Sequence, residues 1–204
     1  MTTNARDYRG KRALDIAVTV MTSPLWVPIG LVSAMLIRID SPGPVLYRQR
    51  RVGRSGRSFE VFKFRSMIDD PKGNPVIPDQ SRVTRVGHVL RRFSLDELPQ
   101  LLNVLRGDMS LVGPRPALEY QVERLDERQR ERSTVRPGLT GLAQLNGRNT
   151  IAWAERIEWD IDYVNRQSPW LDLKLLVSTP FIVLSGRGIS GHPADDPLVV
   201  NPPE

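Results

Sequence analysis

The sequence places two adjacent carboxylates, Asp96 and Glu97, in the segment SLDELPQLLNVLRGDMS (residues 94–110). Ser94 precedes Glu97 by three residues, a spacing typical of the capping box that opens a helix. Backbone N–H groups at such a terminus attract phosphate, and a carboxylate there could attack phosphorus or help to bind Mg²⁺. The helix terminus should also favour the ionised form of Asp96. The alternative is that both residues are ordinary acids of a first helical turn.

Two further segments could bind phosphate. In GPRP (residues 113–116), a rigid turn could direct the guanidinium of Arg115 at a phosphate oxygen, although the same turn could simply carry a surface arginine. The segment RPGLTGLAQLNGRN (residues 136–149) is rich in glycine, which permits close approach of a ligand to the backbone. It lacks the spacing of known phosphate loops, so a structural loop is the alternative. Its polar candidates are Arg136, Gln144, Asn146 and Arg148.

The overall charge favours anionic partners. The 29 Lys and Arg residues exceed the 23 Asp and Glu residues, which gives a net charge of +6. One basic stretch contains Arg48, Arg50, Arg51, Arg54 and Arg57. No nucleic-acid-binding motif is present, so anionic lipid headgroups are the better interpretation, with a non-catalytic membrane-surface or nucleic-acid-binding protein as the alternative function. Without cysteine and with two isolated histidines, a divalent metal would need oxygen ligands.

An apolar segment near the N-terminus suggests a membrane. Residues 16–37 carry no charge and as a straight helix would reach roughly 33 Å, about the thickness of a hydrocarbon core. Pro24 predicts a break, and the Ser23 hydroxyl could satisfy a backbone group freed there. Basic residues flank the segment on both sides, which places both ends in the cytoplasm. These features favour a re-entrant helix–break–helix, and a kinked helix that crosses the membrane is the alternative.

The remaining pattern predicts an α+β fold that is mostly helical. Residues 45–67 read as two short strands around a Gly/Ser/Arg loop. Helices are expected over residues 86–93, 95–105, 152–167 and 171–184, with Gly107 ending the second and the last packing on the protein or the bilayer. Residues 120–132 read as a charged, solvated helix and residues 135–149 as irregular. We expect one catalytic domain over residues 1–204, with a membrane helix over about 13–38, a polar loop over 69–80 and a flexible tail over about 192–204.

Taken together, six segments resemble the small monotopic phosphoglycosyl transferases of the bacterial sugar transferase family. They run in order from about residue 11 to about residue 191: KRALDIAVTVMTSPLW, SPGPVLYRQRRVG, FEVFKFRSM, RRFSLDELPQLLNVLRGDMSLVGPRP, VRPGLTGLAQLNGRN and DIDYVNRQSPWLDLKLL. The resemblance implies transfer of a sugar-1-phosphate from a UDP-sugar to a polyprenol phosphate such as undecaprenyl phosphate, with release of UMP and a requirement for Mg²⁺. It also implies a cytoplasmic active site at the inner membrane, surrounded by interfacial amphipathic helices, and a re-entrant helix hinged at Ser23 and Pro24.

The resemblance assigns roles to individual residues. Asp96 would attack the β-phosphate, form a covalent phosphosugar intermediate and contribute to the Mg²⁺ site, while Glu97 would assist. Substrate phosphates would be bound by Arg91, Arg115, Lys63 and Arg65, and the Gly-rich segment would supply Arg136, Gln144, Asn146 and Arg148. Leu142 stands where many members of the family have Trp. The resemblance therefore indicates the reaction class but not which sugar is transferred.

Overall fold

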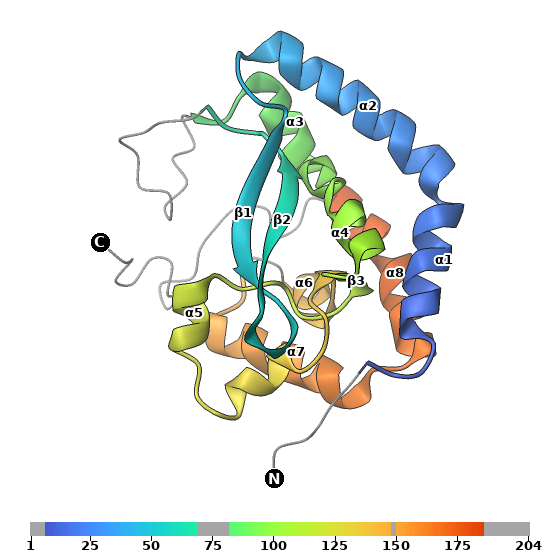
Figure 1. Cartoon of the computed structure of the whole chain (residues 1–204), viewed down its shortest axis with the longest axis vertical. Coiled ribbons are helices and arrows are strands. Elements are labelled where there is room, and N and C mark those ends of the chain that lie inside the picture. The colour runs from blue at the N-terminus through green and yellow to red at the C-terminus, as the bar shows by residue number, and fades with distance from the viewer. Residues whose placement is uncertain (1–6, 69–81, 148–149, 186–204) are drawn as a thin grey trace.

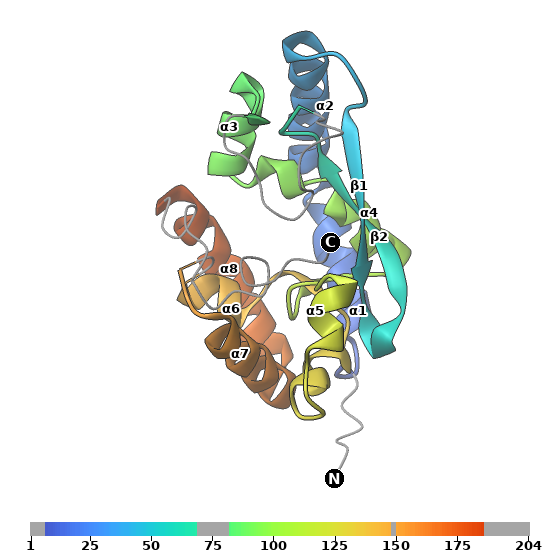
Figure 2. The same cartoon turned by 90° about the vertical axis from the view of Figure 1, so that its left-hand side faces the viewer.

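The computed structural model describes residues 7–68, 82–147 and 150–185. In Figure 1 two N-terminal helices run along one edge of the molecule, and a β-hairpin lies across its middle. Figure 2 shows α6, α7 and α8 on one side, with the hairpin and the N-terminal helices on the other. The described residues are mostly helical with little sheet, as expected. The predicted loop at 69–80 and the predicted tail from 192 lie outside them.

The apolar N-terminal segment consists of two helices, α1 (Lys11–Met21) and α2 (Ser23–Asp40), with a break at Thr22. Pro24 lies in the first turn of α2, where its missing N–H costs nothing. The predicted break is therefore present, but the expected role of the Ser23 hydroxyl is taken by neighbours. The Thr22 hydroxyl donates to the Val18 carbonyl at 2.7 Å, and the Trp26 indole N–H donates to the Thr19 carbonyl at 2.9 Å.

Helix α1 is polar on its inner face and apolar on its outer face. Lys11, Asp15 and Thr19 recur every fourth residue and are all buried, at most 2% exposed. Val20 and Met21, by contrast, are 54% and 79% exposed. A helix that faces water on its outside normally has the opposite arrangement. The outer face of α1 is therefore built for apolar surroundings.

Helix α2 presents an apolar surface along its length. This helix of 18 residues is long enough and apolar enough to cross a membrane, and only 11% of its residues are buried inside the protein. The exposed apolar side chains include Leu25, Leu31, Met35 and Ile39. Such a continuous surface is typical of contact with lipid or with another protein.

The predicted hairpin is confirmed as β1 (Leu46–Val52) and β2 (Ser58–Phe64), joined through a short 3₁₀ turn, η1 (Arg54–Gly56). The strands are antiparallel, and Tyr47 pairs with Lys63. Asn103, fully buried on α4 (Gln100–Arg106), fixes the hairpin to this helix. Its side chain accepts from the Phe62 N–H at 3.0 Å and donates to the Glu60 carbonyl at 2.7 Å.

The predicted helix over residues 95–105 is interrupted. After α3 (Arg85–Arg92), a three-residue 3₁₀ turn, η3 (Leu95–Glu97), precedes α4. The predicted capping box is wrong, because Ser94 is left-handed (φ 53°) and its side chain makes no capping hydrogen bond. Pro99 is the N-cap of α4, and Leu98 before it keeps helical backbone angles (φ −51°, ψ −39°), so the backbone departs from helical geometry at Ser94 and not at the proline. Gly107 (φ 95°) ends α4 as predicted.

Two predictions for the following segments are wrong. Residues 120–132 form two short pieces, α5 (Glu119–Glu123) and the 3₁₀ turn η4 (Gln129–Ser133), and Arg132 is buried. The segment expected to be irregular contains β4 (Gly138–Thr140) and α6 (Leu142–Asn146). Strand β4 pairs in parallel with β3 (Ser110–Val112), and neither strand was predicted.

The last two helices agree with the sequence pattern: α7 (Trp153–Arg166) and α8 (Pro169–Ser185). Tyr163 of α7 and Leu175 of α8 join the main core with α4, β2 and β3. Asp172 of α8 is buried and accepts from Lys11 of α1 at 2.5 Å and from Tyr163 at 2.7 Å. The outer side of α8 exposes Trp170 and Phe181, so this helix resembles α2 in its apolar surface.

Candidate active site

The structure joins four of the predicted site residues. Asp96 and Glu97 lie on η3, and two cations from other elements meet Glu97. Lys63 of β2 donates to its Oε1 at 2.8 Å, and Arg115 donates to the same oxygen at 2.7 Å. Glu97 therefore links the hairpin, η3 and the loop that follows β3. Its side chain is held in place by two charge-assisted hydrogen bonds.

A buried ion pair positions the loop of Arg115. Arg132 of η4 donates to Asp160 of α7 at 2.9 and 2.5 Å, and the two side chains are 4% and 1% exposed. The same guanidinium donates to the backbone carbonyl of Arg115 at 2.8 Å. Buried charges are tolerated when they are paired and hydrogen-bonded in this way. The Arg132–Asp160 pair thus ties the Arg115 loop to α7.

The two neighbouring carboxyl groups have opposite pKa shifts. Burial alone would raise the pKa of Glu97, but Arg115 and Lys63 outweigh it and hold that pKa well below its usual range. Burial raises the pKa of the Asp96 carboxyl; Lys63 opposes this rise, and the negative charge of Glu97 adds to it. Burial therefore opposes the effect expected of a helix terminus on Asp96, and η3 is only a single 3₁₀ turn.

This difference separates the possible roles of the two carboxylates. Glu97 is engaged by two cations, whereas no ion pair joins Asp96 to a cation within the described residues. A carboxylate of raised pKa is the more basic one and, once ionised, the better nucleophile. The geometry leaves Asp96 available to react, with the positive charges of Lys63 and Arg115 close by.

A divalent metal could be held here only with help from a ligand. Within the described ranges, no group of three or more His, Cys, Asp or Glu side chains converges. Mg²⁺ commonly binds through one or two carboxylates together with phosphate oxygens and waters. Asp96, with the adjacent Glu97, supplies oxygen ligands of this kind. The donor set therefore fits Mg²⁺ bound jointly by the protein and a phosphorylated substrate.

Two other residues that were predicted to bind phosphate, Arg91 and Arg65, have surroundings different from those of Lys63 and Arg115. Arg91, on α3, is near enough to act on Asp96, whose pKa its charge helps to lower. Arg65 is buried, and its guanidinium donates to the Ser41 and Pro42 carbonyls at 2.7 and 2.6 Å. These bonds fix the turn after α2, while the buried Nε of Arg65 has no hydrogen-bond partner among the described residues.

The Gly-rich segment contributes a buried amide. The side-chain oxygen and nitrogen of Gln144, on α6, are both buried and have no hydrogen-bond partner in the described part of the chain. Buried polar groups are normally paired, so this amide is available to a ligand. Asn146 is exposed and donates to the Leu142 carbonyl within the same helix at 2.8 Å. Arg148 lies outside the described residues.

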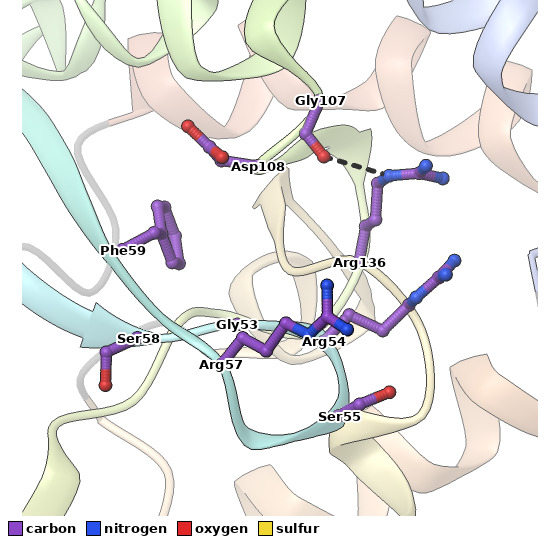
Figure 3. A pocket seen from close by; sticks show the side chains of 9 residues that line it. All are labelled: Gly53, Arg54, Ser55, Arg57, Ser58, Phe59, Gly107, Asp108 and Arg136. Atoms are coloured by element: carbon purple, nitrogen blue, oxygen red, sulfur yellow. Dashed lines mark hydrogen bonds between the residues drawn. The ribbon is translucent and has the colours of Figure 1, made fainter.

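Arg136 lies apart from Asp96 and Glu97, the dyad of neighbouring carboxylates. It forms an ion pair with Asp7 and donates to the Gly107 carbonyl at 3.0 Å. Figure 3 shows it beside a hollow of about 390 Å³, where Arg54 and Arg57 of the hairpin turn also lie. Neither Asp96 nor Glu97 lines this hollow. The structure thus does not bring Arg136 together with the predicted catalytic pair.

One residue near the dyad was missed by sequence reasoning. Arg51, interpreted as part of a lipid-binding basic stretch, lies on the same face of the hairpin as Lys63. Its Nη1 is 3.4 Å from the Pro116 carbonyl, beside Arg115. The alternation of a strand could have found it: Tyr47, Gln49 and Arg51 share one face, and Arg48 and Arg50 share the other.

Comparisons with known proteins match most of this chain to one family. Residues 6–186 match the family described as bacterial sugar transferase. The uncharacterized sugar transferase EpsL of Bacillus subtilis is 44% identical over 181 residues, which cover 88% of this chain and 89% of that protein. The UDP-glucose:undecaprenyl-phosphate glucose-1-phosphate transferase of Caulobacter vibrioides is 45% identical, covering 83% and 67%. The corresponding N-acetylgalactosaminephosphotransferase of Aeromonas hydrophila is 43% identical, but the match spans 44% of it.

Proposed function

Because this chain belongs to the bacterial sugar transferase family, we propose that it transfers a sugar-1-phosphate from a UDP-sugar to a polyprenol phosphate. UMP would be released, and undecaprenyl phosphate is the acceptor that the names of the Caulobacter and Aeromonas relatives indicate. The product would be the first membrane-bound intermediate in the assembly of a glycan. The chain is thus a phosphoglycosyl transferase.

The observation that carries this proposal is the unequal pair of carboxylates. Glu97 is bound by Lys63 and Arg115, and Asp96 has no cation bound to it within the described residues. In the first step, a carboxylate oxygen of Asp96 attacks the β-phosphorus of the UDP-sugar. The bond from that phosphorus to the bridging oxygen breaks, and UMP leaves with the bridging oxygen. The sugar phosphate is then held on Asp96 as an acyl phosphate.

In the second step, a phosphate oxygen of the polyprenol phosphate attacks the same phosphorus. The acyl phosphate bond breaks, which restores the Asp96 carboxylate and releases the lipid-linked sugar. Lys63 and Arg115 stabilise negative charge on the transferring phosphoryl group, which is the main task of such a site. A bound Mg²⁺ would supply further neutralisation of the diphosphate. The Gln144 amide, which has no partner among the described residues, is available to bind the sugar or the nucleotide.

We place this chemistry at the cytoplasmic face of the inner membrane. The apolar outer faces of α1 and α2 support a location in lipid, and the break at Thr22 supports a helix pair that enters one leaflet and returns. Trp170 and Phe181 on the outer side of α8 would contact the same membrane. The competing reading, a non-catalytic basic protein that binds membranes or nucleic acid, is not favoured by the relatives.

The direct test of the function is release of UMP. Purified protein, incubated with a panel of UDP-sugars and undecaprenyl phosphate, should release UMP together with an equal amount of lipid-linked sugar phosphate. A panel of UDP-sugars is needed because the proposal does not specify which sugar is transferred. Folded protein that releases UMP from none of them would contradict the proposal. Salt-dependent binding of RNA or DNA by the same preparation would then favour the alternative.

The topology can be tested with single cysteines, because the chain has none of its own. We expect Arg9→Cys, just before α1, and Arg48→Cys, on β1 after α2, to react with a membrane-impermeant thiol reagent only from the cytoplasmic side. Both positions are exposed in the structure, so protection would have to come from the membrane.

Met21→Cys is the matched control, because it is exposed beside the break and would lie in the bilayer. It should react from neither side. Reaction of Arg9→Cys from the periplasmic side would show that α1 and α2 cross the membrane, and the re-entrant arrangement would have to be abandoned.

A further inference from the structure

Arg51 belongs to the surface that faces the dyad. In the hairpin register, Arg51 lies opposite Phe59 and Tyr47 lies opposite Lys63, so Arg51 and Lys63 project from the same face. Lys63 uses this face to reach Glu97 at 2.8 Å. Arg50, the preceding residue, projects from the opposite face and pairs with Glu119. Arg51 is therefore directed towards the site, and its neighbour away from it.

The guanidinium of Arg51 is fixed but not neutralised. Its Nε and Nη2 donate to the Gln49 side-chain oxygen at 3.2 and 2.7 Å, and its Nη1 lies 3.4 Å from the Pro116 carbonyl. These partners are neutral. In the described part of the chain, no carboxylate lies within ion-pair distance of Arg51. A partly buried charge usually has an opposite charge beside it.

Arg115 makes this position less favourable for Arg51. Burial and, next, the positive charge of Arg115 lower the pKa of Arg51 to about 10. Glu97 is the nearby carboxylate that could balance both arginines, but Arg115 and Lys63 already occupy it. Two cations placed side by side in this way would be stabilised by an anion bound between them.

We propose that Arg51 and Arg115 together bind one phosphate group of a substrate. This inference rests on the proposed function and deepens it. The planar guanidinium groups suit a tetrahedral phosphate, to which each can donate two parallel hydrogen bonds. Two substrates carry such a group: the nucleotide sugar has a phosphate that leaves with UMP, and the lipid acceptor has its own. Measuring the two half-reactions separately distinguishes the phosphate of the nucleotide from the phosphate of the lipid.

The experiment measures each half-reaction for Arg51→Gln, with Arg166→Gln as the matched control, because Arg166 is exposed on α7 and pairs with Asp162. The first half-reaction is followed as the phosphosugar adduct formed from the UDP-sugar alone. The second starts from preformed adduct and adds undecaprenyl phosphate. We expect Arg51→Gln to raise the half-saturating concentration of one substrate by about ten- to a hundredfold, the range for a lost charged hydrogen bond. Arg166→Gln should match the wild type in both.

The affected half-reaction identifies the phosphate. A change in the first alone assigns the site to the nucleotide, and a change in the second alone assigns it to the lipid phosphate. A lower maximal rate with unchanged half-saturation would mean that Arg51 only supports the Pro116 loop, and this overturns the inference. Equal behaviour of Arg51→Gln and Arg166→Gln overturns it as well.

Two further measurements keep the outcome clear. If Arg51→Gln does not fold, Arg51→Lys retains the charge and loses the planar fork; a normal half-saturation for this variant in both half-reactions would overturn the paired-arginine site. Wild-type protein is run in parallel. If it releases no UMP from any UDP-sugar, the proposed function itself fails; if it is active and the Arg51 variants are normal, only the Arg51 site fails.

Discussion

Replacing Asp96 with asparagine should stop adduct formation and reduce UMP release by a factor on the order of 10⁴ or more, as for loss of a catalytic nucleophile. The substitution keeps the size of the side chain and removes the carboxylate that attacks phosphorus. Binding of the UDP-sugar should survive, because Lys63 and Arg115 are held by Glu97 and not by Asp96. Intact-mass measurement of protein incubated with UDP-sugar alone would show the added phosphosugar in the wild type only.

The matched control is Asp162→Asn, an identical change at an acid that pairs with Arg166 on α7. It should form the adduct normally. Peptide mapping should place the wild-type adduct on Asp96. If rapid quenching finds no adduct, and UMP appears only when the polyprenol phosphate is present, transfer is direct. Asp96 would then be a metal ligand and not a nucleophile.

Removal of divalent metal should have the second-largest effect. Metal stabilisation of transferring phosphate contributes several kcal/mol, so EDTA should lower UMP release by about 10³-fold, and Mg²⁺ or Mn²⁺ should restore it. No cluster of three ligands occurs among the described residues, so the protein alone should bind Mg²⁺ weakly and the UDP-sugar should strengthen that binding. Calorimetry with and without the nucleotide sugar measures this difference. Full activity in a metal-free preparation would contradict the prediction.

The sequence alone identified the central residues of the candidate site but not all of their surroundings. Asp96, Glu97 and Arg115 stand in short, distinctive segments, and Lys63 lies on a strand that the pattern predicts. The family resemblance therefore pointed to all four residues. Arg51 was missed because the face of a strand depends on the hairpin register, which five clustered arginines do not reveal. Arg132 was misjudged because a charged segment reads as solvated unless its buried partner, here Asp160, is known.

The errors in the fold have similar physical causes. The capping spacing of Ser94 and Glu97 predicts a helix that begins at Ser94, and only the structure shows that Ser94 is left-handed and that the turn after it is 3₁₀. The parallel pair of β3 and β4 joins three-residue strands that are far apart in the chain. Strands so short have no alternation to detect. The break in the apolar segment was predictable because Pro24 is a strong local signal.

The inverted polarity of α1 has a consequence for the biosynthesis of the protein. Lys11 forms its buried ion pair with Asp172, which is 161 residues later in the chain. A buried lysine left without its partner is an uncompensated charge, which typically destabilises a fold by about 3–5 kcal/mol. Helix α1 therefore cannot take its final place until α8 has been synthesised. The docking of α1 is thus a late event, which brings together helices from the beginning and the end of the described residues.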